Sequence, residues 1–252
     1  MQTNLADKPR QLNEKWLLLG TLLSSTGNSM IWPVMTLYIT GVLNQSFTTA
    51  GVVLMIGAMV SLFGSFVGGK LFDHWRPYVA MVMTSIIILA AVASLIFFNK
   101  WPVFAILIWI ANFGMGVEQT LVNSFATTVP GQKTRVIFNN MYIVLNIGVV
   151  LGTLAVGYLF DYGFSLLMMI STAIYFGLTL IIITKFNVSL DTDNLIDVRA
   201  NDKEEQFNKP EVTRKKFKLT PVLIAIGALL FITYLSYMLW ETVMAPHMKT
   251  LG

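Results

Sequence analysis

The sequence predicts an all-α polytopic membrane protein. Of its 252 residues, 55% are hydrophobic and only 12% are charged, whereas a soluble domain carries about 25% charged residues. Apolar runs of roughly 20 residues recur, each long enough to cross a hydrocarbon core of about 30 Å as a helix. Because the basic residues lie in the gaps between these runs, the net charge of +4 indicates membrane orientation rather than a nucleic-acid surface.

The apolar runs divide the chain into four parts. Residues 1–15 form a polar tail, and residues 16–186 hold six helices. Residues 187–219 form a polar linker, and residues 220–252 hold a seventh helix that begins a second half. The predicted spans are roughly 16–42, 49–72, 78–98, 102–128, 137–160, 164–186 and 220–246.

The Lys and Arg residues set the predicted orientation. If the N-terminus lies in the cytoplasm, 15 of the 17 fall on the cytoplasmic side, and only Lys100 and Lys249 lie outside. Inside segments carry such an excess of positive charge. We therefore predict a multi-pass protein of the cell membrane with a cytoplasmic N-terminus and a cytoplasmic linker.

A repeated string predicts internal symmetry. GKLFD at 69–73 and GYLFD at 157–161 close the second and fifth runs, 88 positions apart, and Gly64 falls on Gly152 under the same shift. Helices three spans apart run in opposite directions, which indicates an inverted repeat of three plus three helices. A second pair of similar strings, NSMIWP in the first run and ETVMAP in the seventh, relates helices that run in the same direction.

These strings resemble signatures of the major facilitator superfamily, and especially of its bacterial drug-exporter-like members. GGKLFDHWRP is similar to the loop between helices two and three, with His74 where an Arg is usual. NIGVVLGTLAVG resembles the fifth-helix signature of drug/proton antiporters, with Thr153 where a Pro is usual. The resemblance implies a gating role for the matching residues of the loop. It also implies twelve helices in two halves, so we expect this chain to be truncated after its seventh helix and inactive alone. The matching residues are Gly69, Asp73 and Arg76 in the loop, and Gly148, Gly152 and Gly157 in the fifth helix.

Polar rows on four helices predict a substrate cavity. Polar groups facing lipid are costly, so such rows should face a wet cavity or a neighbouring helix. Tyr and Met suit apolar or cationic ligands. On the fourth helix the row also includes Asn112 and Gly116. The predicted cavity residues are Ser24, Asn28, Trp32, Gln119, Asn123, Tyr142, Asn146, Tyr234, Tyr237, Met238 and Glu241.

Small residues predict a different kind of surface. Gly57, Ser61, Ser65 and Gly69 recur every four residues along the second helix, and the glycines of the fifth helix lie opposite its polar row. Small side chains let backbones approach closely. We interpret these rows, including Gly148, Gly152 and Gly157, as packing surfaces.

Two acids, Glu118 and Glu241, lie inside predicted spans. A charge at mid-membrane costs roughly 2.5–3.5 kcal/mol on insertion scales, so each is a candidate for binding and releasing a coupling proton. Glu241 shares the Tyr/Met row of the seventh helix. Glu118 is turned about 100° from the Gln119 row, which leaves a structural role as its alternative.

The predicted function is secondary active transport, by proton-coupled efflux of small amphipathic or drug-like molecules. Two alternatives stay open: nutrient uptake by proton symport, and a non-transporting membrane subunit that pairs with a separate C-terminal half. The chain has no Gly-rich phosphate loop, no Cys and only two His, so we predict no ATP-driven pump, no enzyme, no metal site and no cofactor. The expected partners are the bilayer, a small-molecule substrate and a proton or other coupling ion.

Overall fold

The computed structural model describes residues 12–129 and 134–187, together with four positions of the seventh run. The chain divides into two units, Met1–Ser189 and Leu190–Gly252, and the first holds all the helices whose bounds are given. They are α1 (Glu14–Gly41), α2 (Phe47–His74), α3 (Pro77–Phe97), α4 (Val103–Ala126), α5 (Thr134–Leu159), the short 3-10 helix η1 (Phe160–Tyr162) and α6 (Phe164–Lys185).

The six helices predicted for the first unit are present, with bounds within a few residues of those predicted. The described helices from α2 to α6, with α5 counted through η1, are long and apolar enough to cross a membrane. Helix α1 is as long as α2 but is not one of these five, because residues 24–29 (SSTGNS) make its middle polar. The linker and most of the seventh span lie outside the described residues; Leu229, Ile232, Thr233 and Ser236 are described, and all are helical.

Local chemistry fixes the helix ends. The Asn13 side chain caps α1 by accepting a hydrogen bond from the Lys15 backbone N–H, and the Ser46 hydroxyl caps α2 in the same way. Such caps satisfy backbone donors that a helix start leaves unpaired. Pro77 begins α3, where its missing N–H costs nothing. Gly163, at φ 107°, makes the turn into α6, a conformation that glycine adopts readily.

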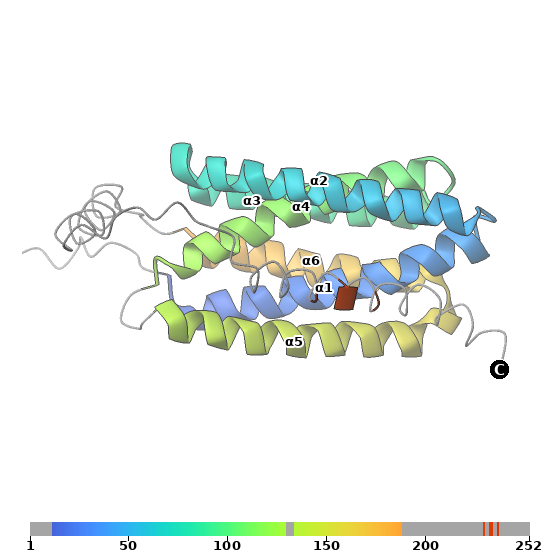
Figure 1. The fold of residues 1–252 in the computed structure, drawn as a ribbon. Helices are drawn as coiled ribbons and strands as arrows, with labels where there is room; N and C mark the ends of the chain where they lie inside the picture. Colours follow the sequence, from blue (N-terminus) through green and yellow to red (C-terminus); the bar gives the residue numbers. More distant parts are fainter. Residues whose placement is uncertain (1–11, 130–133, 188–228, 230–231, 234–235, 237–252) are drawn as a thin grey trace, which may run out of the picture. The chain divides into compact units, whose positions relative to one another are not determined.

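The six helices form two groups of three (Figure 1). One group contains α2, α4 and α3, with α4 packed between the other two. The second contains α5, α1 and α6, with α1 packed between the other two, and the groups meet mainly where α3 packs on α6. Shifting by one triplet, α1 to α4, α2 to α5 and α3 to α6, converts one group into the other, as the predicted inverted repeat requires.

Glycines bring α2 and α4 into backbone contact. Gly64 lies against the Phe113 carbonyl, and Gly116 lies against the Ser61 carbonyl. The Ser65 hydroxyl donates a 3.2 Å hydrogen bond to the Gly116 carbonyl across the same seam. Gly69, at the edge of the seam, has only Thr120 near it. Small residues therefore allow this close approach.

The seam between α1 and α5 is built in the same way. A Cβ added to Gly148 would lie 2.9 Å from the Leu22 carbonyl oxygen, and one on Gly152 would lie 2.5 Å from that of Thr26. The Ser29 hydroxyl lies 3.4 Å from the Gly148 carbonyl oxygen and donates to it. Gly64 and Gly152, which the 88-residue shift aligns, thus occupy corresponding seams.

No described residue packs on Gly157, so the packing role predicted for it stays a prediction. A Cβ on Gly157 would meet no atom within 4 Å. The α1 seam continues from Gly148 and Gly152 to the buried Val156, in steps of four residues. Gly157 lies one residue beyond this row, so its face turns about 100° away from α1.

Aromatic clusters lie near both ends of α4. At one end Tyr38 stacks on Phe164 with ring centroids 3.8 Å apart, and Phe104 lies against both rings. At the other end Phe125 makes edge contacts with Phe72 and Phe186. A polar side chain that points inward from α4 between Phe104 and Phe125 therefore has an aromatic cluster toward each end of the helix.

Candidate functional site

Three of the predicted cavity residues lie in the polar middle of α1. Ser24, Asn28 and Trp32, all predicted to line the cavity, are half-buried. The side-chain oxygen of Asn28 is buried and accepts no hydrogen bond from any described residue. A buried amide oxygen without a donor is costly, so this oxygen is suited to accept a hydrogen bond from a bound ligand.

Glu118 lies in the interior of the first unit, with 1% of its surface exposed. The Ser24 hydroxyl of α1 lies near its carboxyl group, and Tyr175 of α6 lies close enough to interact with it electrostatically. Neither carboxyl oxygen, however, makes a hydrogen bond of good geometry to a described residue. Glu118 is thus a buried acid at the meeting point of three helices, one from one group and two from the other.

Every other charged residue of the described helices lies near a helix end. These residues are Glu14, Lys15, Lys70, Asp73, Arg135 and Lys185, with Asp161 in the short helix η1 and Arg76 and Lys100 in the connections. Glu118 is the one charged side chain in the middle of a described span. No basic residue on a described helix is therefore placed to neutralise it at that depth.

Tyr175 was not predicted from the sequence as a site residue. It is 1% exposed, and its hydroxyl has no hydrogen-bond partner among the described residues. Its ring packs so closely on Gly27 of α1 that an added Cβ there would lie 2.8 Å from ring atom Cε2. A signal existed: Ser171, Tyr175 and Thr179 recur every four residues along α6, and all three are buried.

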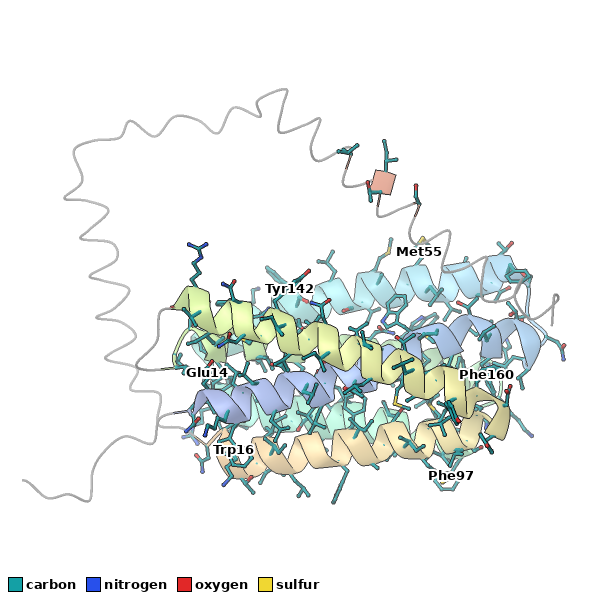
Figure 2. All side chains as sticks on the ribbon, turned by 90° about the horizontal axis from the view of Figure 1, so that it is seen from below. Glu14, Trp16, Met55, Phe97, Tyr142 and Phe160 are labelled. Atoms are coloured by element: carbon teal, nitrogen blue, oxygen red, sulfur yellow. The ribbon has the colours of Figure 1, made fainter. Side chains whose placement is uncertain are left out.

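The other predicted cavity residues form two separate pairs. On α4, the Gln119 amide donates to the Asn123 side chain over 3.4 Å. On α5, the Asn146 amide donates to the Tyr142 backbone carbonyl over 2.7 Å, and the Tyr142 side chain is 69% exposed (Figure 2). The structure does not bring these pairs together, because α4 and α5 belong to different groups of helices.

The predicted polar row of α4 is split by its packing. Asn112 is buried, donates to the Ile108 carbonyl and lies against Gly57. Gly116 is in the α2 seam, whereas Gln119 is exposed. The first half of the row therefore serves helix packing, and only its second half is available to a ligand.

The predicted gating residues lie mostly in a helix rather than a loop. Gly69 and Asp73 are in the last turns of α2, and Arg76 immediately precedes α3. Lys70 of the same stretch places its ammonium 4.6 Å from the centroid of the Phe66 ring. The gating role itself stays a prediction.

Four predicted cavity residues, Tyr234, Tyr237, Met238 and Glu241, lie outside the described residues. The second candidate for proton coupling, Glu241, is therefore untested. Among the described residues, Glu118 is the interior acid.

The sequence matches a model of the Major Facilitator Superfamily over residues 17–252. It is 29% identical to the Uncharacterized MFS-type transporter YttB of Bacillus subtilis, over 97% of this chain and 59% of that protein. It is 26% identical to the Uncharacterized MFS-type transporter YqjV of the same organism, over 54% of this chain and 33% of that protein. The chain thus spans less than two thirds of the length of these relatives.

Solved transporter structures share the fold. A mutant of the peptide transporter POT in complex with alafosfalin aligns with a TM-score of 0.65 at 16% identity, over 93% of this chain and 48% of that one. The POT family transporter PepTSo aligns with a TM-score of 0.61 at 17% identity, over 70% of this chain and 37% of that one. Helix order, the inverted repeat and the sequence match agree, and the chain belongs to the Major Facilitator Superfamily of membrane transporters.

Proposed function

We propose that this chain is the N-terminal part of a proton-coupled exporter of small amphipathic molecules, and that Glu118 carries the coupling proton. The carrying observation is the burial of the Glu118 carboxyl group, which has no hydrogen-bond partner among the described residues. The protein is proposed to lie in the cell membrane with its N-terminus in the cytoplasm, as the distribution of Lys and Arg predicts.

The surroundings of Glu118 favour a proton as the coupling ion. An ionised carboxylate without donors is costly in an apolar interior, and a bound proton removes the charge with no change in packing. The neighbouring Ser24 and Tyr175 carry hydroxyl groups that can donate to a carboxylate or accept from a carboxylic acid. A site of this kind can take up a proton in one conformation and release it in another.

Three of the predicted cavity residues, one half-buried and two exposed, support an amphipathic substrate. Trp32, Gln119 and Tyr142 combine aromatic surface with hydrogen-bonding groups, a mixture suited to organic cations and apolar molecules. The direction of transport rests on the resemblance of the α5 signature to that of drug/proton antiporters.

Whole-cell transport tests the proposal. The 252-residue chain is expressed alone and as a fusion with the remaining C-terminal part of YttB, and accumulation of a fluorescent lipophilic cation is followed under an imposed proton gradient. We expect the fusion to lower accumulation. Glu118→Gln, which keeps the side-chain shape but binds no proton, should abolish the dependence on the gradient.

A fusion that exports the dye equally well with Glu118→Gln would refute the role of this acid. Gradient-driven uptake of a nutrient, without dye export, would favour a symporter. If the chain transports the dye only in a complex that co-purifies with a second hydrophobic polypeptide, the chain acts as a subunit. Asp161→Asn, at an exposed position in η1 at the end of its span, is the matched control for loss of one carboxyl group.

A further inference from the structure

We propose that the corner where the start of α1 meets the end of α6 binds the headgroup of an anionic phospholipid. The corner consists of Lys15 and Trp16 of α1 and Lys185 of α6. The ligand class is a lipid whose phosphate gives it a net negative charge, such as phosphatidylglycerol. This site belongs to the membrane surface, and it goes beyond the proposed transport function and does not depend on it.

The Lys185 ammonium group is held over an aromatic ring rather than beside an acid. It lies 4.7 Å from the centroid of the Trp16 ring, within the range of a cation–π contact. The ring attracts the cation but carries no net charge, so it leaves the positive charge of Lys185 unneutralised. A phosphate group at the membrane surface can therefore still pair with this ammonium group.

The acid that is closest to this corner in the sequence contacts another helix. Glu14 directly precedes Lys15, and its Oε1 accepts a 2.8 Å hydrogen bond from the side-chain amide of Asn140 on α5. Figure 2 shows Glu14 on the α5 side of α1 and Trp16 on the α6 side. The described contact of this carboxylate is thus with α5 rather than with Lys185, and the exposed Lys15 adds a second cation to the corner.

Packing fixes the end of α6 that carries Lys185. The Tyr78 hydroxyl of α3 donates a 2.9 Å hydrogen bond to the Ile183 carbonyl, one of the last four of the helix, which as a class lack helical donors. Phe186, which follows Lys185, is 1% exposed, and its ring would lie 3.5 Å from a Cβ added to Gly20 of α1. Contacts on both sides of Lys185 thus hold its backbone in place, which reduces the entropy lost on binding a ligand.

The position of the corner along the spans favours a lipid over a free anion. Helix α6 is long and apolar enough to cross a membrane, and Lys185 is its last residue. Trp side chains are enriched at the level of the headgroups, where Trp16 would lie. One turn from Lys15, Leu19 is 36% exposed, so apolar surface for an acyl chain begins beside the cations. A free phosphate ion would use the cations only, whereas a lipid uses both surfaces.

Native mass spectrometry of the 252-residue chain tests the proposal. The chain is titrated with phosphatidylglycerol and with zwitterionic phosphatidylcholine that has the same acyl chains. We expect tighter binding of the anionic lipid, and we expect Lys185→Gln to weaken that binding about fivefold, as loss of one cation near an anionic headgroup does. Lys185→Arg, which keeps the charge, should retain the binding. The matched control is Lys100→Gln, an exposed lysine between α3 and α4, which should leave the affinity unchanged.

The same titration tests the role of the aromatic ring. Trp16→Leu removes the surface that holds the ammonium group, so we expect weaker binding of phosphatidylglycerol. Trp16→Phe keeps an aromatic face for the cation and should retain more of the affinity. Equal losses in these two variants would contradict the cation–π contact as the feature that positions Lys185.

Three results would overturn the proposal. The first is equal affinity for the two lipids. The second is a preference for phosphatidylglycerol that survives both Lys15→Gln and Lys185→Gln, because the lipid would then bind elsewhere on the chain. The third is complete displacement of the lipid by inorganic phosphate, which would show a site for a free anion only. None of these results bears on the proton site, which Glu118→Gln tests separately.

Discussion

The two groups of three helices have the same internal seam and different outer surfaces. Gly64 on α2 and Gly152 on α5 correspond in the repeat, and each lies against a backbone carbonyl of a central helix. On its outer side, however, α2 is apolar, whereas α5 adds an exposed polar row. The α2 residues are Val52, Met55, Met59, Leu62, Phe63 and Phe66, and the α5 residues are Asn139, Tyr142, Asn146 and Thr153.

The two groups thus share their packing seams, whereas their outer surfaces differ. Close backbone packing requires small residues at the same places in both groups. The outer surface depends only on what covers it, and an apolar surface such as that around Met55 (Figure 2) suits lipid or another apolar helix. We infer that the polar row of α5 faces a wet surface, because lipid contact would be costly.

The interiors of the two groups differ as well. Shifted by 88 residues, Glu118 of α4 falls on Met30 of α1, and both side chains are buried. Met30 accepts a weak hydrogen bond from Ser171 of α6 at 3.8 Å, whereas the Glu118 carboxyl group has no such partner among the described residues. Met30 thus packs the core, whereas Glu118 places an acid at the corresponding position. Functional sites often break a packing rule in this way, at a cost in stability.

The largest expected effect is at the seams. Gly64→Val and Gly152→Val each place a side chain against backbone, which cannot move aside, so each should lower the free energy of unfolding by at least about 3 kcal/mol. Denaturant titration in detergent measures it, with Gly157→Val as the control in open space. Equal losses are expected at both seams. A large loss at one seam only would break the structural equivalence.

The outer surfaces are compared by placing one charge at matched depth. Leu62→Asp on α2 should cost about 3 kcal/mol, as a charge facing lipid at mid-span does. Asn146→Asp, near the middle of α5, should cost much less because we expect its row to face water. The measurement is the fraction of chain that resists alkaline extraction from membranes. Similar losses for the two variants would show that both surfaces face lipid.

The smallest expected effect is in the interior, and it has the opposite sign. Glu118→Met copies the residue found at the related position of α1 and removes an unpartnered polar group at similar volume. We expect the free energy of unfolding to rise by about 1–3 kcal/mol, while proton-coupled transport is lost. A fall in stability would instead support the structural role that the sequence left open for Glu118.

The sequence predicts the helices of the first unit well because span length and hydrophobicity are strong signals. It also predicts the seams, since small residues every four positions mark a packing face. The sequence leaves the packing role of Gly157 a prediction, since no described residue lies against it. It also overestimates how apolar α1 is, because a central helix covered by its neighbours tolerates the polar run SSTGNS.

The site is less predictable, because a helical wheel gives angles within a helix but not the neighbours that each angle faces. Glu118 seemed less suitable than Glu241, since it is turned away from the Gln119 row. In the structure that turn points it into the interior, toward Ser24 and Tyr175. Tyr175 is not among the predicted residues because the polar rows that predict the cavity lie on other helices, although Ser171 and Thr179 mark a buried row around it.

The central claim is that Glu118 binds and releases a proton inside the bundle. The most direct measurement is the pH-difference infrared spectrum of the chain in nanodiscs, from which the spectrum of Glu118→Gln is subtracted. The account predicts a carboxylic-acid band that disappears as a carboxylate band rises, both absent in the variant. Identical spectra for the two proteins across the accessible pH range would contradict it.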